Sequence, residues 1–250
     1  MNRNIKLIIA YDGAGFCGWQ RQDDTKTVQG AIEEALEKMH GHPVSLTGAG
    51  RTDSGVHAAG QAANFYTDID SIPANRFAPA LNSFLPHEIR IMEASETYSD
   101  FHARFSAKSR LYRYQFLCRC GENSPHESRY HLILRRHPHI ELLNAYGRLL
   151  SGETDCSIFA GAGDTSKSKN RYIYRAYFYI EKDKLIFEIC ANAFLRNMVR
   201  SVAGTFLHYE EKQTEPQELR KIIASGDRSL SGPTLPPEGL FLWKVDYCSQ

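Results

Sequence analysis

Apolar and polar positions alternate with a period of two in several stretches of the chain, which is the pattern of strands that bury one face. In residues 110–117, for example, Tyr112, Tyr114 and Phe116 occupy every second position. This alternation predicts strands at residues 6–11, 57–66, 88–94, 110–117, 171–181, 185–190 and 240–247.

Other stretches repeat apolar residues at the helical spacing of three or four positions. Residues 27–39 place Ala31, Ala35 and Met39 on one face of a helix and three glutamates largely on the other. The same spacing predicts helices at residues 75–84, 140–150, 195–208 and 216–225.

Strands and helices interleave through both halves of the chain, which indicates an α+β protein. We expect two similar halves, residues 1–107 and 108–250, whose mixed and mainly antiparallel sheets join into one extended sheet flanked by helices. No low-complexity linker separates the halves near residues 105–108, so we expect them to pack together rather than to be tethered.

The composition is that of an ordinary globular protein, since 42% of the 250 residues are hydrophobic and 24% are charged. No apolar run approaches the roughly 18–20 residues that a membrane helix needs, and the first strand is too short for the apolar core of a signal peptide. The six cysteines are scattered, unlike the framework of a secreted disulfide-rich protein. We therefore expect a cytoplasmic protein that has no membrane contact and keeps its cysteines reduced.

The net charge of +1 conceals an asymmetry between the halves. Residues 1–107 carry 9 Lys and Arg against 13 Asp and Glu, whereas the remaining residues carry 21 against 16. The second half could therefore supply most of an RNA-binding face. The alternative is that these charges are spread over an ordinary solvated surface.

One loop differs from the rest of the chain in its density of small residues: Gly48-Ala49-Gly50-Arg51-Thr52-Asp53-Ser54-Gly55-Val56-His57-Ala58. Glycines allow a substrate to approach the backbone closely, so the loop can present the Asp53 carboxylate without crowding it. The structural alternative is a tight turn in which Asp53 caps its own backbone. The loop matches neither glycine-rich phosphate-binding motif, G-x-x-x-x-G-K-[ST] or G-x-G-x-x-G.

The loop resembles the G-R-T-D-x-G-V-H-A signature of the tRNA pseudouridine synthase A family, and a match over nine positions with one of them free is highly specific. Other blocks resemble this family in order and spacing along almost the whole chain. They are Tyr11-Asp12-Gly13, Phe16-Cys17-Gly18-Trp19-Gln20, Thr27-Val28-Gln29-Gly30, Leu81-Asn82, Leu85-Pro86, Phe101-His102-Ala103-Arg104-Phe105-Ser106-Ala107, Arg110-Leu111-Tyr112-Arg113-Tyr114, Phe194-Leu195-Arg196-Asn197-Met198-Val199-Arg200 with Gly204, and Pro236 with Gly239-Leu240.

The resemblance implies the pseudouridine synthase fold and an isomerase that converts uridine to pseudouridine at tRNA positions 38 to 40, in the anticodon stem-loop. It implies that Asp53 is the nucleophile, because a carboxylate can add to the sugar or the base and divide one hard step into easier ones. It also implies a homodimer that acts on tRNA. An isomerisation requires no redox cofactor, nucleotide or metal, so we expect none.

Three more residues take roles from the resemblance, each beside a structural alternative. Tyr112 matches the tyrosine that stacks on the target uracil, although a tyrosine in a strand usually packs in the core. Arg51 would contact RNA near the flipped nucleotide, or form a structural salt bridge. Arg196 falls where the family has a basic residue that pairs with the nucleophilic carboxylate, or it is a surface charge on a helix.

Two neighbouring residues receive structural roles. His57 titrates near neutrality when unperturbed, which suits a general base, but we interpret it as a strand residue that supports the loop. Tyr114 has the same strand parity as Tyr112 and is expected to be structural.

Some features favour other functions or depart from the family. Cys118-x-Cys120, followed by His126, His131, His137 and His139, allows a zinc site, but its spacing suits zinc poorly. The chain has Thr154-Asp155-Cys156 where the family often has H-D-F, and the polar residues 161–170 predict a mobile loop. A silent RNA-binding protein on the same fold and a hydrolase that uses Asp53 and His57 are the alternative functions.

Overall fold

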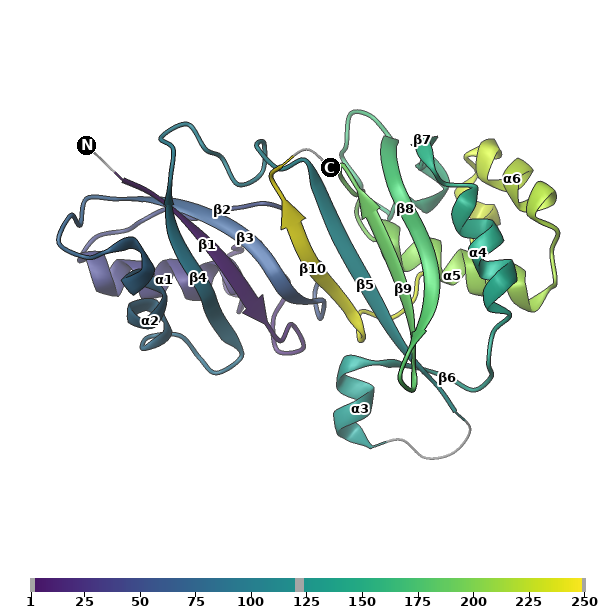
Figure 1. The fold of residues 1–250 in the computed structure, drawn as a ribbon, viewed down its shortest axis with the longest axis horizontal. Helices are drawn as coiled ribbons and strands as arrows, with labels where there is room; N and C mark the ends of the chain where they lie inside the picture. Colours follow the sequence, from purple (N-terminus) through teal and green to yellow (C-terminus); the bar gives the residue numbers. More distant parts are fainter. Residues whose placement is uncertain (1–2, 120–123, 249–250) are drawn as a thin grey trace. The chain divides into compact units, whose positions relative to one another are not determined.

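The computed structural model describes residues 3–119 and 124–248, and they form two compact units (Figure 1). Unit 1 consists of Met1–Lys108 and Phe241–Gln250, and unit 2 of Ser109–Leu240. From the sequence we expected residues 108–250 to form the second half. In the structure, residues 241–250 group with unit 1 instead. The last strand returns to unit 1 because it pairs in parallel with an N-terminal strand, at Phe241 opposite His57.

Unit 1 is a sheet with the strand order β4-β1-β3-β10, to which the short strand β2 adds along β3. Strand β1 is antiparallel to both β3 and β4, and β10 is parallel to β3. The elements of this unit are β1 (Arg3–Tyr11), α1 (Val28–His40), β2 (Thr47–Gly48), β3 (His57–Thr67), a 3-10 turn (Ala74–Arg76), α2 (Phe77–Asn82), β4 (Ile89–Thr97) and β10 (Leu240–Asp246).

The core of unit 1 lies between this sheet and its two helices. Helix α1 begins after Thr27, whose side chain accepts a hydrogen bond from the Gly30 amide. The buried face of α1 contains Ala35 together with Ile32 and Leu36, whereas Ala31 and Met39 are half-buried. Burying the larger aliphatic side chains removes more apolar surface from water, and this decides how the helix is turned.

Unit 2 contains the strands in the order β5-β9-β8-β7, with β6 in parallel beside β5. Its elements are β5 (Ser109–Cys118), α3 (Pro125–Tyr130), β6 (Leu132–Leu134), α4 (Ile140–Arg148), β7 (Gly152–Asp155), two 3-10 turns (Ser157–Phe159 and Arg228–Leu230), β8 (Asn170–Glu181), β9 (Lys184–Ala191), α5 (Met198–Glu211) and α6 (Pro216–Ser225).

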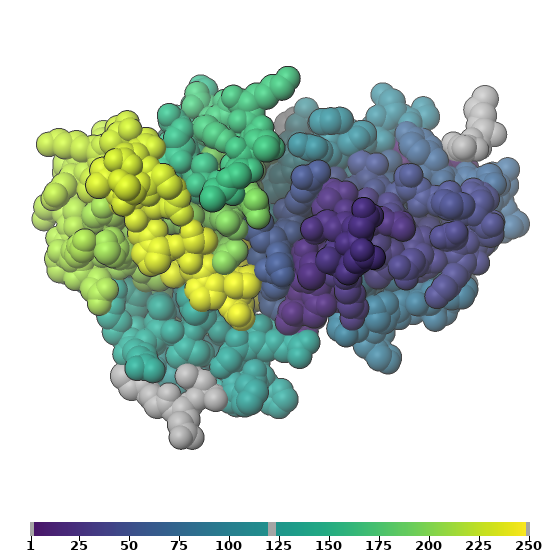
Figure 2. Space-filling model, turned by 180° about the vertical axis from the view of Figure 1, so that it is seen from behind, coloured from purple at the N-terminus to yellow at the C-terminus, as the bar shows by residue number. Residues whose placement is uncertain are grey.

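Helices α4 and α5 cover one face of this sheet. A Cβ on Gly147 of α4 would lie 2.2 Å from the Ala176 carbonyl oxygen of β8, so this close approach requires glycine. The rings of Phe178, Phe187 and Phe206 connect β8, β9 and α5 through the core. From the opposite side, α6 and the segment after it, in yellow-green and yellow, lie at the surface of this unit (Figure 2).

The α+β class and the mixed, mainly antiparallel pairing are confirmed. The helix expected from residue 195 begins at Met198, because Asn197 takes a left-handed φ of 59° that interrupts the helix. The helix expected at residues 75–84 is shorter and consists of a 3-10 turn and α2. The short elements β2, α3, β6 and β7 do not follow from the hydrophobic pattern.

Candidate functional site

Asp53 lies in the loop between β2 and β3, and its backbone is held from both sides. The Trp19 amide donates to the Thr52 carbonyl oxygen at 3.1 Å, and the Val56 amide donates to the Asp53 carbonyl oxygen at 3.1 Å. Gly55 supplies a left-handed φ of 78° within the turn. The loop therefore presents a half-buried Asp53 side chain from a fixed backbone.

Two glycines in residues 11–20 allow that segment to pack directly against the Asp53 loop. A Cβ on Gly13 would lie 2.0 Å from the Val56 carbonyl oxygen, and a Cβ on Gly18 would lie 2.7 Å from the Thr52 carbonyl oxygen. Both distances are far below any normal van der Waals contact. The blocks of sequence around residues 11–20 thus form the support of the Asp53 loop.

Buried polar contacts fix the residue beside the aspartate. The Tyr11 and Thr52 hydroxyls lie 2.8 Å apart, and Tyr11 is only 4% exposed. Burial raises the pKa of Tyr11, so its hydroxyl stays protonated. At the start of the loop, the side-chain Nε2 of Gln61 donates to the Gly50 carbonyl oxygen at 2.8 Å.

Arg51 lies on the same loop as Asp53 and is exposed. Its Nε donates to Gln20 Oε1 at 3.1 Å. A neutral amide holds the guanidinium in place without cancelling its charge. This geometry fits a side chain that offers its charge to a ligand better than it fits a structural salt bridge.

His57 is completely buried at the start of β3. Its Nδ1 accepts a hydrogen bond from the Gly13 amide and lies 3.1 Å from Asp12 Oδ1. The ring stacks on Phe241 with centroids 4.7 Å apart. His57 thus holds the segments around the Asp53 loop together, as expected, and it is not exposed as a general base for a hydrolase would need to be.

Tyr112 lies in β5 of unit 2, opposite Ile189, and is 8% exposed. Its ring meets Phe194 edge-on, with centroids 4.9 Å apart. Tyr114, two residues further along the strand, is fully buried, donates to the Pro236 carbonyl oxygen and stacks on Phe116. The geometry of Tyr114 is that of the structural residue we expected.

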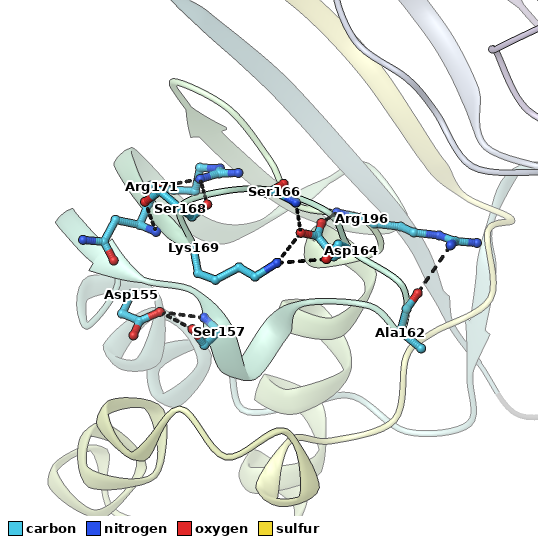
Figure 3. Close-up of polar contacts among 10 residues, drawn as sticks. Asp155, Ser157, Ala162, Asp164, Ser166, Ser168, Lys169, Arg171 and Arg196 are labelled. Atoms are coloured by element: carbon cyan, nitrogen blue, oxygen red, sulfur yellow. Dashed lines mark hydrogen bonds and ion pairs between the residues drawn. The ribbon is translucent and has the colours of Figure 1, made fainter.

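Arg196 is exposed in the turn before α5 and is not part of the helix, contrary to the structural alternative. Its backbone amide donates to Asp164 Oδ2 at 2.8 Å, and its Nη1 donates to the Ala162 carbonyl oxygen at 3.3 Å (Figure 3). Residues 161–170, which we expected to be mobile, are therefore joined by specific bonds to the turn that carries Arg196.

Arg200 is a candidate that the sequence reasoning did not single out. It lies in the first turn of α5 and is half-buried. Its Nε donates to the Leu235 carbonyl oxygen at 2.6 Å, and its Nη1 donates to Asn197 Oδ1 at 3.0 Å. The sequence contained a signal for it, because Arg200 is the last residue of the block at positions 194–200 that also contains Arg196.

The structure thus brings the predicted residues into two groups. Arg51 and Asp53 share one loop of unit 1, whereas Tyr112 and Arg196 belong to unit 2, where Phe194 lies two residues from Arg196 and touches Tyr112.

The predicted alternatives to this site find no support in the described residues. Across residues 3–119 and 124–248, no group of three or more His, Cys, Asp or Glu side chains is placed to hold a metal ion. Cys118 is half-buried, and Cys120 lies outside the described residues. Within the same ranges, no helix combines the length and apolar character needed to cross a membrane.

Comparisons with known proteins agree over nearly the whole chain. The model of a family described as tRNA pseudouridine synthase matches residues 7–106 and 148–248. The chain is 53% identical to the tRNA pseudouridine synthase A of Treponema denticola, over 98% of this chain and 93% of that protein. It is 42% identical to the protein of that name from Caldicellulosiruptor saccharolyticus, over 98% of this chain and 100% of that protein.

A solved structure is also similar, but only distantly. It is one chain of the crystal structure of a Cbf5-Nop10-Gar1 complex, with a TM-score of 0.35 and 10% identity, over 80% of this chain and 53% of that chain.

Proposed function

The chain belongs to the tRNA pseudouridine synthase family, and from this premise we propose that Asp53 is its nucleophile and that its targets are the uridines at positions 38 to 40 of the anticodon stem-loop. The enzyme is an isomerase that converts uridine in tRNA to pseudouridine. The observation that carries the assignment of Asp53 is the loop itself, which holds its backbone on both sides and leaves the carboxylate half-exposed.

The reaction needs a carboxylate because one glycosidic bond is exchanged for another. The bond between ribose C1′ and uracil N1 breaks, the uracil rotates, and C1′ bonds to C5. The proton on C5 leaves and N1 gains one, so the atoms balance and no oxidant or reductant is consumed. A carboxylate that adds covalently during this exchange separates the breaking step from the joining step.

The remaining residues would hold the base and the RNA. Tyr112 would stack on the flipped uracil through a ring that Phe194 already holds edge-on. Arg51 is exposed beside Asp53 and would contact the RNA near the flipped nucleotide. Arg196 is also exposed and would bind the substrate.

Arg196, in the turn before α5, and Arg200, in the first turn of α5, suit different roles. A guanidinium that is partly buried and already fixed by two hydrogen bonds stabilises a nearby charge more strongly than an exposed one. The resemblance assigns the cation that pairs with Asp53 to Arg196; we propose Arg200 of the same block as the alternative candidate, because two hydrogen bonds within unit 2 already hold its guanidinium. Arg196 is exposed, and we propose that it binds the substrate through tRNA phosphate.

The proposed partner is tRNA, bound by a homodimer in the cytoplasm without a cofactor. The excess of Lys and Arg after residue 107 supports a phosphate-binding surface in the second half of the chain. Two copies would offer two such surfaces and two sites to one tRNA. Light scattering of the purified protein gives the mass, and a monomer at micromolar concentration would refute the dimer.

The experiment that tests the function is tritium release from tRNA labelled at uracil C5. Joining C1′ to C5 expels that label, so we expect release from tRNA with uridine at positions 38 to 40 and none when those positions carry cytidine. Tight binding of tRNA without release would instead establish a silent RNA-binding protein.

A further inference from the structure

The turn that carries Arg196 is fixed by residues 161–164. The Gly161 amide donates to the Arg196 carbonyl oxygen at 2.8 Å, and the Arg196 amide donates to Asp164 Oδ2 at 2.8 Å. The guanidinium donates to the Ala162 carbonyl oxygen. One short segment thus binds the backbone of Arg196 on both sides and its side chain as well. Figure 3 draws the bonds from Arg196 to Asp164 and Ala162.

The approach of the two segments is close enough to require a glycine. A Cβ on Gly161 would lie 2.9 Å from the Arg196 carbonyl oxygen and 2.8 Å from Asn197 Nδ2. Asn197 itself takes a left-handed φ of 59°. Asparagine adopts this conformation more readily than other non-glycine residues, and the Asn197 side chain is held here by a hydrogen bond from Arg200 Nη1.

Asp164 is the centre of these contacts. Its side chain is 5% exposed, and both carboxylate oxygens accept hydrogen bonds. Oδ1 accepts from Lys169 Nζ at 2.5 Å and from the Ser166 amide at 2.9 Å, while Oδ2 accepts from the Arg196 amide. Burial alone would raise the pKa of Asp164, but the bonds from Lys169 and the two amides outweigh it and hold that pKa well below its usual range.

We propose that Asp164 is the positioning residue for Arg196: its ionised carboxylate fixes the turn so that the guanidinium meets tRNA phosphate in a set direction. This inference rests on the proposed role of Arg196 in binding substrate. The physical reason is preorganisation. An exposed arginine on a loose turn loses conformational entropy when it binds, whereas one on a fixed turn has already lost part of it.

A first experiment tests the positioning without any activity. Asp164→Asn keeps the shape of the side chain but replaces one accepting oxygen with an NH₂ group. We expect the Arg196 amide to exchange with solvent roughly tenfold faster or more in this variant, as the loss of a hydrogen bond to a charged group implies. Nuclear magnetic resonance of the full-length protein measures that rate.

The matched control is Asp155→Asn. Asp155 also accepts hydrogen bonds within its own segment, from the Ser157 amide at 2.9 Å and its hydroxyl at 2.6 Å, but its carboxylate is not the one bonded to Arg196. We expect this variant to leave exchange at Arg196 unchanged. Unchanged exchange at Arg196 in Asp164→Asn would overturn the proposal.

A second experiment connects the turn to the substrate through a cycle of Asp164→Asn, Arg196→Gln and the double variant. We expect either single change to raise the KM for tRNA by about fivefold to tenfold, the size of one charge-assisted contact, with little change in kcat. The double variant should be no worse than Arg196→Gln. Effects that multiply, or a fall in kcat alone, would refute the positioning role. Absence of pseudouridine formation in the wild type would refute the proposed function instead, and amide exchange would still decide how Arg196 is held.

Discussion

The loop of Asp53 and the turn of Arg196 both present a charged side chain from an irregular segment, but different forces hold them. Around Asp53, the support comes from backbone hydrogen bonds, from the buried pair Tyr11 and Thr52, and from the close approach allowed by Gly13. Around Arg196, it comes from the ionised side chain of Asp164.

The two regions differ in which changes of side-chain size and charge they tolerate. Neutral, buried contacts respond little to salt or pH, and they fail when a side chain is too large for the space. A turn held by a carboxylate responds to the loss of one charge, in addition to the steric limit set by the close approach at Gly161. The support of the proposed nucleophile is thus broken by steric changes, whereas the support of the proposed substrate-binding arginine is also broken by a change of charge.

Gly13→Ala should produce the largest effect on the support of Asp53. The new Cβ would lie 2.0 Å from the Val56 carbonyl oxygen, so the loop must move. We expect a loss of about 1–3 kcal/mol in the free energy of unfolding and a fall of roughly hundredfold in kcat, because a small misplacement of the nucleophile is costly. Denaturant unfolding and tritium release measure the two quantities.

Gly15→Ala is the control for that prediction, because a Cβ on Gly15 has no heavy atom within 4 Å. It should leave both stability and rate near wild type. Equal behaviour of the two variants would show that the close approach at Gly13 does not support the loop.

Tyr112 gives a comparison of ring and hydroxyl. Tyr112→Phe keeps a stacking face worth roughly 1–3 kcal/mol per base and should bind tRNA normally, but it should turn over roughly tenfold to hundredfold more slowly if the hydroxyl moves a proton. Tyr112→Ala should lose both binding and rate. Tyr114→Phe, on the same face of β5, should lower stability by about 1 kcal/mol and leave the rate unchanged. Near wild-type rates for Tyr112→Phe and Tyr112→Ala would return Tyr112 to the core.

The two arginines should separate binding from chemistry. If Arg200 is the cation that keeps Asp53 ionised, Arg200→Gln should raise the pKa of Asp53 and move the acid limb of the pH–rate profile to higher pH. Arg196→Gln should leave that profile in place and reduce the slope of log affinity against log salt by about 0.7–0.9, the loss of one phosphate contact. The opposite assignment of the two effects would exchange the roles of the arginines.

A smaller effect should appear in stability against pH. The pKa of Asp164 in the folded protein lies below its ordinary value of 3.8. Its contribution is therefore fully present above that value and is lost as the pH falls toward the folded pKa. We expect Asp164→Asn to cost about 1–2 kcal/mol near neutral pH, and the gap from wild type to narrow progressively as the pH falls from about 4 toward the lowered folded pKa. Denaturant unfolding at several pH values measures it, and a gap that does not depend on pH would contradict the ionic account.

Much of the fold follows from local patterns, since long strands and helices reveal themselves through their period. The start of α5 does not, because the left-handed Asn197 interrupts an apolar pattern that itself continues. Helix α3 escapes the hydrophobic pattern, although its capping box at Ser124 and Glu127 is a signal that could have found it. The return of β10 to unit 1 rests on pairing between residues far apart in sequence, such as Phe241 and His57, and no local pattern encodes it.

The residues of the candidate site likewise fall into those that the local sequence reveals and those that it does not. Asp53 can be proposed from the sequence because its loop resembles the signature of a family, and short blocks of glycine and aromatic residues support that loop in the structure. Asp164 could not be found, because its bond to Arg196 spans 32 residues and an isolated aspartate in a polar loop carries no signal. Arg200 stood within a block we had noted, but only its burial and its hydrogen bonds distinguish it from Arg196.

The most direct test of the account is single-turnover formation of pseudouridine by wild type and by Asp53→Asn, on tRNA that carries uridine at positions 38 to 40. The substitution is nearly isosteric and leaves the backbone that holds the loop intact. We predict pseudouridine from the wild type and none from Asp53→Asn, with the affinities of the two proteins for tRNA within about tenfold, or 1.4 kcal/mol. Formation of pseudouridine by Asp53→Asn at a rate near wild type would contradict the account, because the carboxylate could not then be the nucleophile.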